Sequence, residues 1–424
     1  MAQRDPAPRR VAQTQKQNSF FGGAAILAAG ILIVKLIGMF YKIPLINIIG
    51  EAGAADFNNA YNIYAVLLTV STAGLPVAVS KLVSEANALD RRNQVRRTFR
   101  LALVLFLTLG IISFLVMFFR ADALAGMMND SKAAAGIRAL APAVVCVGCL
   151  AALRGYSQGH SNMAPTSVSQ IIEALCKLVV GLGLAFWLVK QGKDPDVAAA
   201  GAITGVTVGT VVALAYMVLD FLLSRGREDI RGTDRPDSAG SILANILKIA
   251  VPITLSSSMV GIVTVIDSSL VQGQLQSALD LTEQASRTLY GNYSGALNIY
   301  NLPTSLMAAI TASVIPAVSA ALARRDRRGA ARITGSALRI TALLSFPMGV
   351  GLFVLGTPII RLLFPKLNVA VAGPLLSTLG IATPFVCMVL VCNSVLQAHG
   401  FINLPVIVMV LGGIVKIVNN YNLV

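Results

Sequence analysis

Long apolar stretches separated by short charged segments dominate this chain of 424 residues. No charged residue lies between Arg100 and Arg120, or between Arg287 and Arg324. A helix needs about 20 predominantly apolar residues to cross a bilayer. The pattern therefore predicts eleven membrane-spanning helices, at about 21–49, 58–80, 98–119, 137–153, 164–189, 197–224, 242–272, 290–323, 333–360, 370–395 and 403–424.

An internal repeat runs through this pattern. The tripeptide Ala-Val-Ser at 78–80 returns at 317–319, which is 239 positions later. Three polar residues return at the same offset: Gln158, His160 and Lys177 recur as Gln397, His399 and Lys416. A repeat of this length in so apolar a chain is typical of a duplicated transporter bundle.

The only long polar linker, residues 225–241, separates the two repeats. Six predicted spans precede it, and because six is even, both repeats start on the same side of the membrane. We therefore expect an all-α polytopic membrane protein with two parallel six-helix lobes around a central cavity. Its parts would be a disordered cytoplasmic tail (1–19), an N-lobe (20–224), a cytoplasmic linker (225–241) and a C-lobe (242–424).

The second repeat is shorter than the first. Val424 corresponds to Ala185, inside the fifth span of the first repeat, so the counterparts of residues 186–224 are missing. We expect a C-lobe of about five helices that stops within a helix, as in a fragment or a truncated gene model.

Composition supports the membrane interpretation, since 12% of residues are charged against roughly 25% in soluble domains. The net charge of +15 lies in the loops, which favours a positive-inside topology over nucleic-acid binding. Loops rich in arginine alternate with sparser ones, where charges such as Arg120, Lys132 and Arg287 stand near acids such as Asp122 and Asp130. The N-terminus is therefore predicted to be cytoplasmic.

Several chemistries find no support in the sequence. All five cysteines fall in apolar stretches, so we expect neither a disulfide nor a metal site. There is no nucleotide-binding motif and no acid–base set that would suggest an enzyme or an ATP-driven pump. No cofactor is expected.

Charged residues within the predicted spans are the candidate functional groups. Lys35, Lys177 and Lys416 lie near mid-span, where a charge facing lipid costs about 2.5–3.5 kcal/mol. We therefore expect each to face a watery cavity, an anion or a carboxylate. Lys42 shares a helix face with Lys35, but it could also reach the interface as a snorkelling side chain.

Glu173 precedes Lys177 by four residues, which allows either a structural ion pair or a coupled-ion or substrate site. Its repeat counterpart is Gly412, so Lys416 has no matching acid, and this weakly favours an anion site. The candidate cavity residues are Lys35, Lys42, Lys177, Glu173, Arg154, Asn298 and Lys416.

Four segments, at 19–27, 34–45, 153–159 and 163–173, resemble the polysaccharide-biosynthesis and stage V sporulation protein B group. That group belongs to the multidrug/oligosaccharidyl-lipid/polysaccharide exporter superfamily, as do the lipid II flippases. The resemblance, which covers residues 19–424, implies two six-helix lobes and places Lys35 at a cavity-lining basic position of the flippases. This chain departs from the flippase pattern just before Leu302-Pro303, where Asn298 and its neighbours stand in place of a basic residue.

The resemblance implies a flippase that moves an undecaprenyl-pyrophosphate-linked saccharide from the inner to the outer leaflet of a bacterial plasma membrane. Lipid II, for peptidoglycan synthesis, is the favoured substrate. The expected partners are this lipid-linked saccharide, membrane lipids, cell-wall synthesis proteins and a coupling ion. Two alternatives stay open: a cation-coupled small-molecule exporter that uses Glu173, and a non-transporting scaffold in a sporulation or cell-wall complex.

Overall fold

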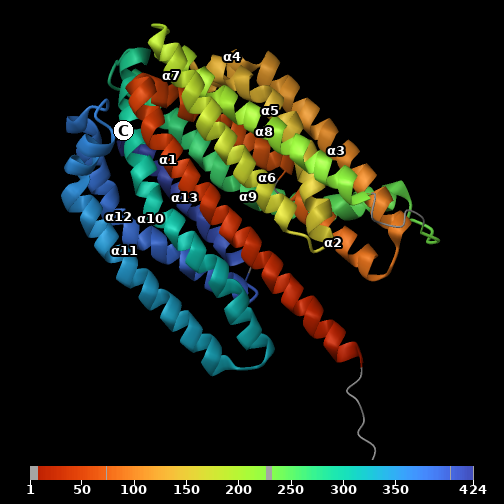
Figure 1. Ribbon diagram of the computed structural model, residues 1–424. Helices are drawn as coiled ribbons and strands as arrows, with labels where there is room; N and C mark the ends of the chain where they lie inside the picture. Colours follow the sequence, from red (N-terminus) through yellow and green to blue (C-terminus); the bar gives the residue numbers. More distant parts are fainter. Residues whose placement is uncertain (1–7, 73, 226–231, 402, 424) are drawn as a thin grey trace, which may run out of the picture.

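The computed structural model describes residues 8–72, 74–225, 232–401 and 403–423, which form helices and their connections without a strand (Figure 1). The elements are α1 (Pro8–Thr72), α2 (Leu75–Ala88), α3 (Arg92–Phe119), α4 (Ala121–Met127), α5 (Ala133–Gly159), α6 (Ala164–Cys176), the π-helix η1 (Lys177–Gly181), α7 (Leu182–Lys190), α8 (Pro195–Arg225), α9 (Ala239–Ser277), α10 (Glu283–Ala323), α11 (Arg327–Leu363), α12 (Val369–Ala398) and α13 (Asn403–Leu423).

Seven helical segments of the described residues are long and apolar enough to cross a membrane, and one of them, 29–88, contains most of the first predicted span and all of the second. Among the described residues, each predicted span falls on helices, apart from Gly74 between α1 and α2. In α9 and α13 the apolar stretches among the described residues are shorter, at 239–255 and 407–416. The expected fold class, an all-α polytopic membrane protein, is confirmed.

The first two predicted spans are joined within α1, which bends at Gly50. The φ of 72° and ψ of −169° at this residue suit glycine, which has no Cβ to clash in this region. Helix α1 already begins at Pro8, inside the stretch 1–19 that was expected to be a disordered tail; residues 1–7 lie outside the described residues. The second predicted span is divided between two helices. Helix α1 ends at Thr72, and the span continues in α2, whose first turn contains Pro76.

The fifth predicted span is built from three consecutive elements, α6, η1 and α7. The π-helical turn begins at Lys177, and such turns widen a helix locally and occur often at functional sites. Helix α8 packs tightly here, because a Cβ on Gly205 would come within 2.4 Å of the Gly181 backbone. The fifth span therefore presents Lys177 from an irregular turn that is fixed against α8.

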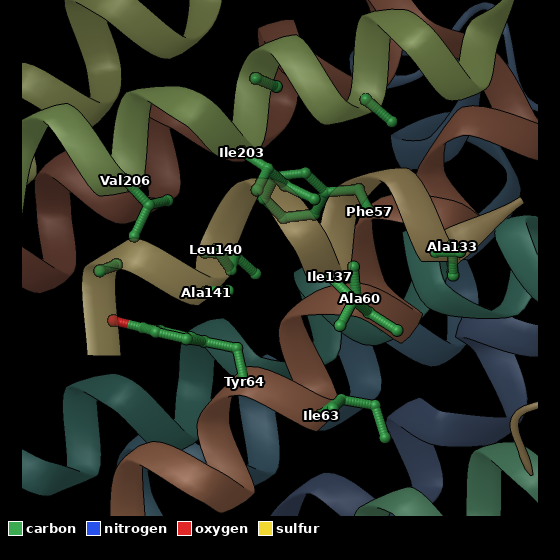
Figure 2. Close-up of a cluster of buried hydrophobic side chains, with 14 of the residues drawn as sticks. Phe57, Ala60, Ile63, Tyr64, Ala133, Ile137, Leu140, Ala141, Ile203 and Val206 are labelled. Atoms are coloured by element: carbon green, nitrogen blue, oxygen red, sulfur yellow. The ribbon is translucent and has the colours of Figure 1, made fainter. Parts of the chain in front are cut away.

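The core of the N-lobe lies between α1, α5 and α8. Phe57 and Ala60 of α1 meet Ile137 of α5 and Ile203 of α8, all of them buried (Figure 2). Close contact between small and branched side chains gives the dense packing typical of protein interiors. This core holds the second half of α1 rigidly against the rest of the N-lobe.

Helix α1 lies between two groups of helices, with α10, α11 and α12 on one side and α3, α5 and α8 on the other (Figure 1). We call the upper end of the bundle in Figure 1 the α4 end, because α4 and α7 lie there. Buried Ile46 and Ala54 of α1 pack with Ile299 of α10 and Phe364, which joins α1 to the first of these groups toward the α4 end. At the opposite end the α10–α11 turn stands apart from α2 and α3.

Candidate functional site

Two lysines of the N-lobe lie against aromatic rings. The Lys177 Nζ is 4.7 Å from the centre of the Tyr61 ring and 4.9 Å from that of Tyr41. The Lys42 Nζ is 5.0 Å from the centre of the Phe57 ring, and it donates a hydrogen bond of 2.7 Å to Asn58. We call Tyr41, Lys42, Phe57, Tyr61 and Lys177 the aromatic–lysine cluster.

The rings of this cluster form one continuous group. The Phe57 and Tyr61 rings are stacked with centroids 6.0 Å apart, and the Tyr41 ring lies 6.1 Å from that of Phe57. The Tyr41 hydroxyl donates to the Ala202 carbonyl of α8 at 3.3 Å. Each ammonium–ring contact contributes about 0.5–2 kcal/mol, so the rings fix the lysines in place without cancelling their charge.

The cluster carries a net positive charge. Within the described part of the chain, no carboxylate lies within ion-pair distance of Lys42 or Lys177. Both side chains are half-buried, and the positive charges of Lys177 and Lys42 repel each other. Two half-buried cations without a counter-charge favour the binding of an anion. A phosphate group is an anion that can accept hydrogen bonds from both ammonium groups.

Glu173 does not pair with Lys177 among the described contacts, so the structural pair considered from the sequence is wrong. Glu173 accepts a charged hydrogen bond of 3.2 Å from Arg154 of α5 instead. Arg154 also donates to Ser169 at 2.9 Å. Glu173 lies in the last turn of α6, just before the π-helix, and from there its side chain reaches Arg154 on α5. Glu173 and Arg154 thus form a structural pair inside the N-lobe.

Lys35 and Asn298 are not joined to the aromatic–lysine cluster by any hydrogen bond or ion pair of the described residues. Lys35 is exposed, beside the exposed apolar side chains of Leu36 and Phe40. The Asn298 amide donates to the Ser294 carbonyl one turn earlier in α10, at 2.9 Å. The predicted cavity role of Lys35 therefore stays a prediction.

Lys416 meets an acid from another helix. Its Nζ lies 2.9 Å from a carboxylate oxygen of Asp267, on α9, and the two side chains are 46% and 10% exposed. The pair borders a pocket of about 390 Å³ within the C-lobe. The residues around this pocket are Asp267, Val271, Leu275, Leu289, Tyr290, Tyr293, Val371, Leu375 and Lys416. An ion pair in a mostly apolar pocket is close to neutral and holds no spare cation for an anion.

Reasoning from the sequence missed a buried ion cluster at the α4 end. Arg287 and Asp130 were assigned to loops, and Asp56 was not considered, yet their side chains are 6%, 0% and 2% exposed. A signal was available: Asn59-x-Tyr61-Asn62 returns as Asn298-x-Tyr300-Asn301, again 239 positions later. This repeat marks a polar, aromatic helix segment in each lobe, and Asn59 of the first copy donates to Asp130 of the ion cluster.

Long apolar helices, two groups of them on either side of α1 and charged clusters inside define a polytopic membrane protein of the exporter type. The family model of the polysaccharide biosynthesis protein matches residues 20–322, and a second model, MatE, matches residues 291–422. The chain belongs to the polysaccharide biosynthesis protein family, within the same superfamily as the multidrug exporters.

Three proteins of Bacillus subtilis are similar in sequence. The uncharacterized membrane protein YabM is 28% identical over 414 residues, 96% of this chain and 75% of the relative. Lipid II flippase MurJ is 31% identical over 208 residues, 46% of this chain and 38% of the relative. Stage V sporulation protein B is 24% identical over 358 residues, 84% and 68% respectively. Of these three relatives, lipid II flippase MurJ carries a transport activity in its name.

Solved structures share the fold. An inward-facing multidrug resistance MATE family transporter superposes with a TM-score of 0.69 at 16% identity, over 92% of this chain and 83% of the other. A transporter of the same superfamily from Pyrococcus furiosus gives a TM-score of 0.61 at 16% identity, over 94% of each chain. At these identities the likeness concerns the fold.

Proposed function

We propose that this protein moves an undecaprenyl-pyrophosphate-linked saccharide from the inner to the outer leaflet of a bacterial plasma membrane, with lipid II as the favoured substrate. The observation that carries the proposal is the pair Lys42 and Lys177, two half-buried cations without an acid partner among the described residues. The anion expected at such a pair is the pyrophosphate of the lipid carrier.

The physical need for such a site is large. A sugar pyrophosphate cannot enter hydrocarbon unaided, because burying a polar or charged group without partners costs several kcal/mol. A polar path between the lobes replaces the water around the head group, while the lipid tail stays in the bilayer. An inside-negative potential favours outward movement of the anionic head by about 2.3 kcal/mol per charge per 100 mV.

The arrangement of the helices fits alternating access. Polar contacts join the two lobes at the α4 end, for example the hydrogen bonds between Asn59 of α1 and Gln272 of α9. The helices diverge at the other end (Figure 1), where positive-inside topology puts the cytoplasm. We therefore assign this conformation as open to the cytoplasm, ready to receive a head group from the inner leaflet.

Sequence similarity supports a lipid-linked substrate. The region of about half the chain that is similar to lipid II flippase MurJ favours a cell-wall precursor, whereas the name of stage V sporulation protein B, which is similar over a longer region, gives no substrate. Interaction with cell-wall synthesis proteins is part of the same proposal. The choice of lipid II over another saccharide rests on this similarity alone.

The direct test is flipping of fluorescent lipid II by the purified protein in proteoliposomes. Lys177→Ala and Lys42→Ala should each slow flipping by about 10- to 150-fold, since a charge-assisted contact contributes about 1.5–3 kcal/mol. Lys190→Ala, which removes an exposed lysine at the end of α7, is the control and should leave flipping unchanged. Lys35→Ala in the same assay decides whether Lys35 acts in the path. Unchanged flipping in both Lys177→Ala and Lys42→Ala would contradict the proposal.

A second candidate is export of a small molecule by a cation-coupled cycle. The MatE match to residues 291–422 and the C-lobe pocket with its Asp267 carboxylate favour it. Export of organic cations from loaded vesicles, without lipid flipping, would establish this alternative. A protein that does neither when purified would fit the scaffold role.

A further inference from the structure

A buried ion cluster closes the α4 end of the bundle. Arg287 of α10 donates to both carboxylate oxygens of Asp56 on α1, with a distance of 2.9 Å from its Nε and 2.5 Å from its Nη2 to Oδ1. The same Nε lies 3.1 Å from Asp130, in the connection between α4 and α5. We call Asp56, Asp130 and Arg287 the latch.

The latch joins the N-lobe to the C-lobe, because Asp56 and Asp130 belong to the first and Arg287 to the second. Uncharged side chains add hydrogen bonds around the latch. Asn59 donates to Asp130 at 2.8 Å and exchanges hydrogen bonds of 3.3 Å with Gln272 of α9. Opening this end for substrate release has to separate these groups and expose them to water.

The charges of the latch do not balance. The side chains of Asp56, Asp130 and Arg287 are 2%, 0% and 6% exposed. If both carboxyl groups and the guanidinium are ionised, one negative charge is buried without a counter-charge. Both carboxyl groups approach the same Arg287 Nε, Asp56 at 2.9 Å and Asp130 at 3.1 Å, and a proton on one of them would remove the excess negative charge. Asp130 Oδ1 otherwise has no hydrogen-bond donor, although it is fully buried.

We propose that the latch is a proton-binding site: closure of the α4 end takes up one proton, shared by Asp56 and Asp130, and opening releases it. The latch is then the site of the coupling ion. This inference rests on the alternating access of the proposed function, but not on the identity of the transported lipid.

Other charged groups near the latch do not supply the missing cation. Glu283, on the first turn of α10, accepts from the Ser131 backbone N–H at 2.8 Å and from its hydroxyl at 2.6 Å, and adds negative charge. The nearby Lys132 is paired with Asp196 at 3.5 Å and is half exposed. Burial raises the pKa of Asp130, in spite of the Asn59 hydrogen bond and the Arg287 charge, which lower it.

Closure of the latch depends on pH because the closed and open states bind different numbers of protons. The closed latch holds a proton that separated, hydrated carboxylates release, so closure is favoured at low pH. As the pH rises through the pKa of the closed latch, the closed state loses this advantage. The ratio of open to closed molecules then increases by up to about tenfold per pH unit for one proton.

The test is a distance measurement across the α4 end. Spin labels on Ala123→Cys and Ala278→Cys, both exposed positions, in a protein whose native cysteines are replaced, report the separation of α4 from the end of α9 in nanodiscs. Double electron–electron resonance from about pH 5 to about pH 9 covers carboxyl groups whose pKa burial raises. The unmodified latch should shift from the short to the long distance as the pH rises.

Asp130→Asn and Asp56→Asn should each keep the short distance at every pH, because an amide donates the hydrogen bond without titrating. Asp196→Asn is the matched control at the same end and should respond like the parent protein. A parent protein without a pH response, or an equal response in both latch variants, would overturn the inference.

Infrared spectroscopy gives a second measurement on the unmodified protein. A protonated carboxyl band, sensitive to deuterium exchange, should be present at neutral pH and absent in the Asp56→Asn and Asp130→Asn variants. Its absence in the parent protein contradicts the proton site even if a variant fails to fold. Neither measurement uses lipid II, so a failure of flipping would not affect the result.

Discussion

The two lobes place equivalent lysines in different electrical surroundings. Lys177 and Lys416 are 239 positions apart in the repeat, yet Lys177 lies on the rings of Tyr41 and Tyr61, whereas Lys416 is paired with Asp267. The N-lobe keeps an uncompensated cation next to Lys42, and the C-lobe neutralises its own. Duplication preserved the lysine, and its partners decide whether it can bind an anion.

Reversing the charge at the two positions should separate them most strongly. Lys177→Glu puts a carboxylate where we place the pyrophosphate, so flipping should fall by at least about 100-fold, since both an attraction of about 1.5–3 kcal/mol is lost and a repulsion is gained. Lys416→Glu disturbs a paired site and should cost much less. Proteoliposome flipping rates measure both, and equal losses at the two positions would remove the distinction between the lobes.

Stability should respond in the opposite order. Lys416→Ala removes the ion-pair partner of the nearly buried Asp267 and should destabilise the protein by about 1–3 kcal/mol. Lys177→Ala removes ring contacts but also the repulsion with Lys42, so its effect should stay below about 1 kcal/mol. Thermal unfolding in detergent compares the two variants. The double change Asp267→Asn with Lys416→Gln should recover stability; no recovery would show that the ion pair is not the cause.

A smaller effect is expected from the ring that holds Lys177. Tyr61→Leu removes one of its two aromatic contacts, worth about 0.5–1 kcal/mol, and should weaken binding of a pyrophosphate lipid by about two- to fivefold. Tyr300→Leu changes the repeat counterpart of Tyr61 and is the matched control. Affinities from nanodisc binding assays should separate the two, and an equal loss would argue against a special role for the N-lobe rings.

The smallest effect concerns the linker between the lobes, which is attached to the N-lobe. Asp234 accepts hydrogen bonds from the backbone N–H groups of Asn93 and Gln94, at 2.8 and 2.9 Å, at the start of α3. Burial raises the pKa of Asp234, but these two bonds outweigh it and hold the pKa below its usual value. The contact is therefore present at neutral pH and is lost as the pH falls through the lowered pKa.

Hydrogen exchange at Asn93 and Gln94 measures this attachment. Asp234→Ala should speed exchange of both amides by about two- to thirtyfold, the range for loss of a helix cap, while Asp280→Ala, in an exposed connection of the C-lobe, should not. Unchanged exchange in Asp234→Ala would show that the linker does not cap α3.

The membrane helices could be predicted from the sequence because uncharged apolar runs as long as the bilayer is thick are rare in soluble domains. The repeat also located the two equivalent lysines. Their partners could not be predicted, since Asp267 reaches Lys416 from a helix 149 positions earlier and its own repeat position is Ala28. Arg287 was misjudged for the same reason: a charge next to a loop looks solvated until packing of α1 against α10 buries it.

Binding of undecaprenyl pyrophosphate without a sugar tests the central claim most directly, because only the anionic group and the lipid remain. The protein in nanodiscs should bind it, the Lys42→Ala, Lys177→Ala double variant should bind it at least about tenfold more weakly, and Lys416→Ala should match the parent protein within about twofold. Equal binding by all three would contradict a cationic site in the N-lobe.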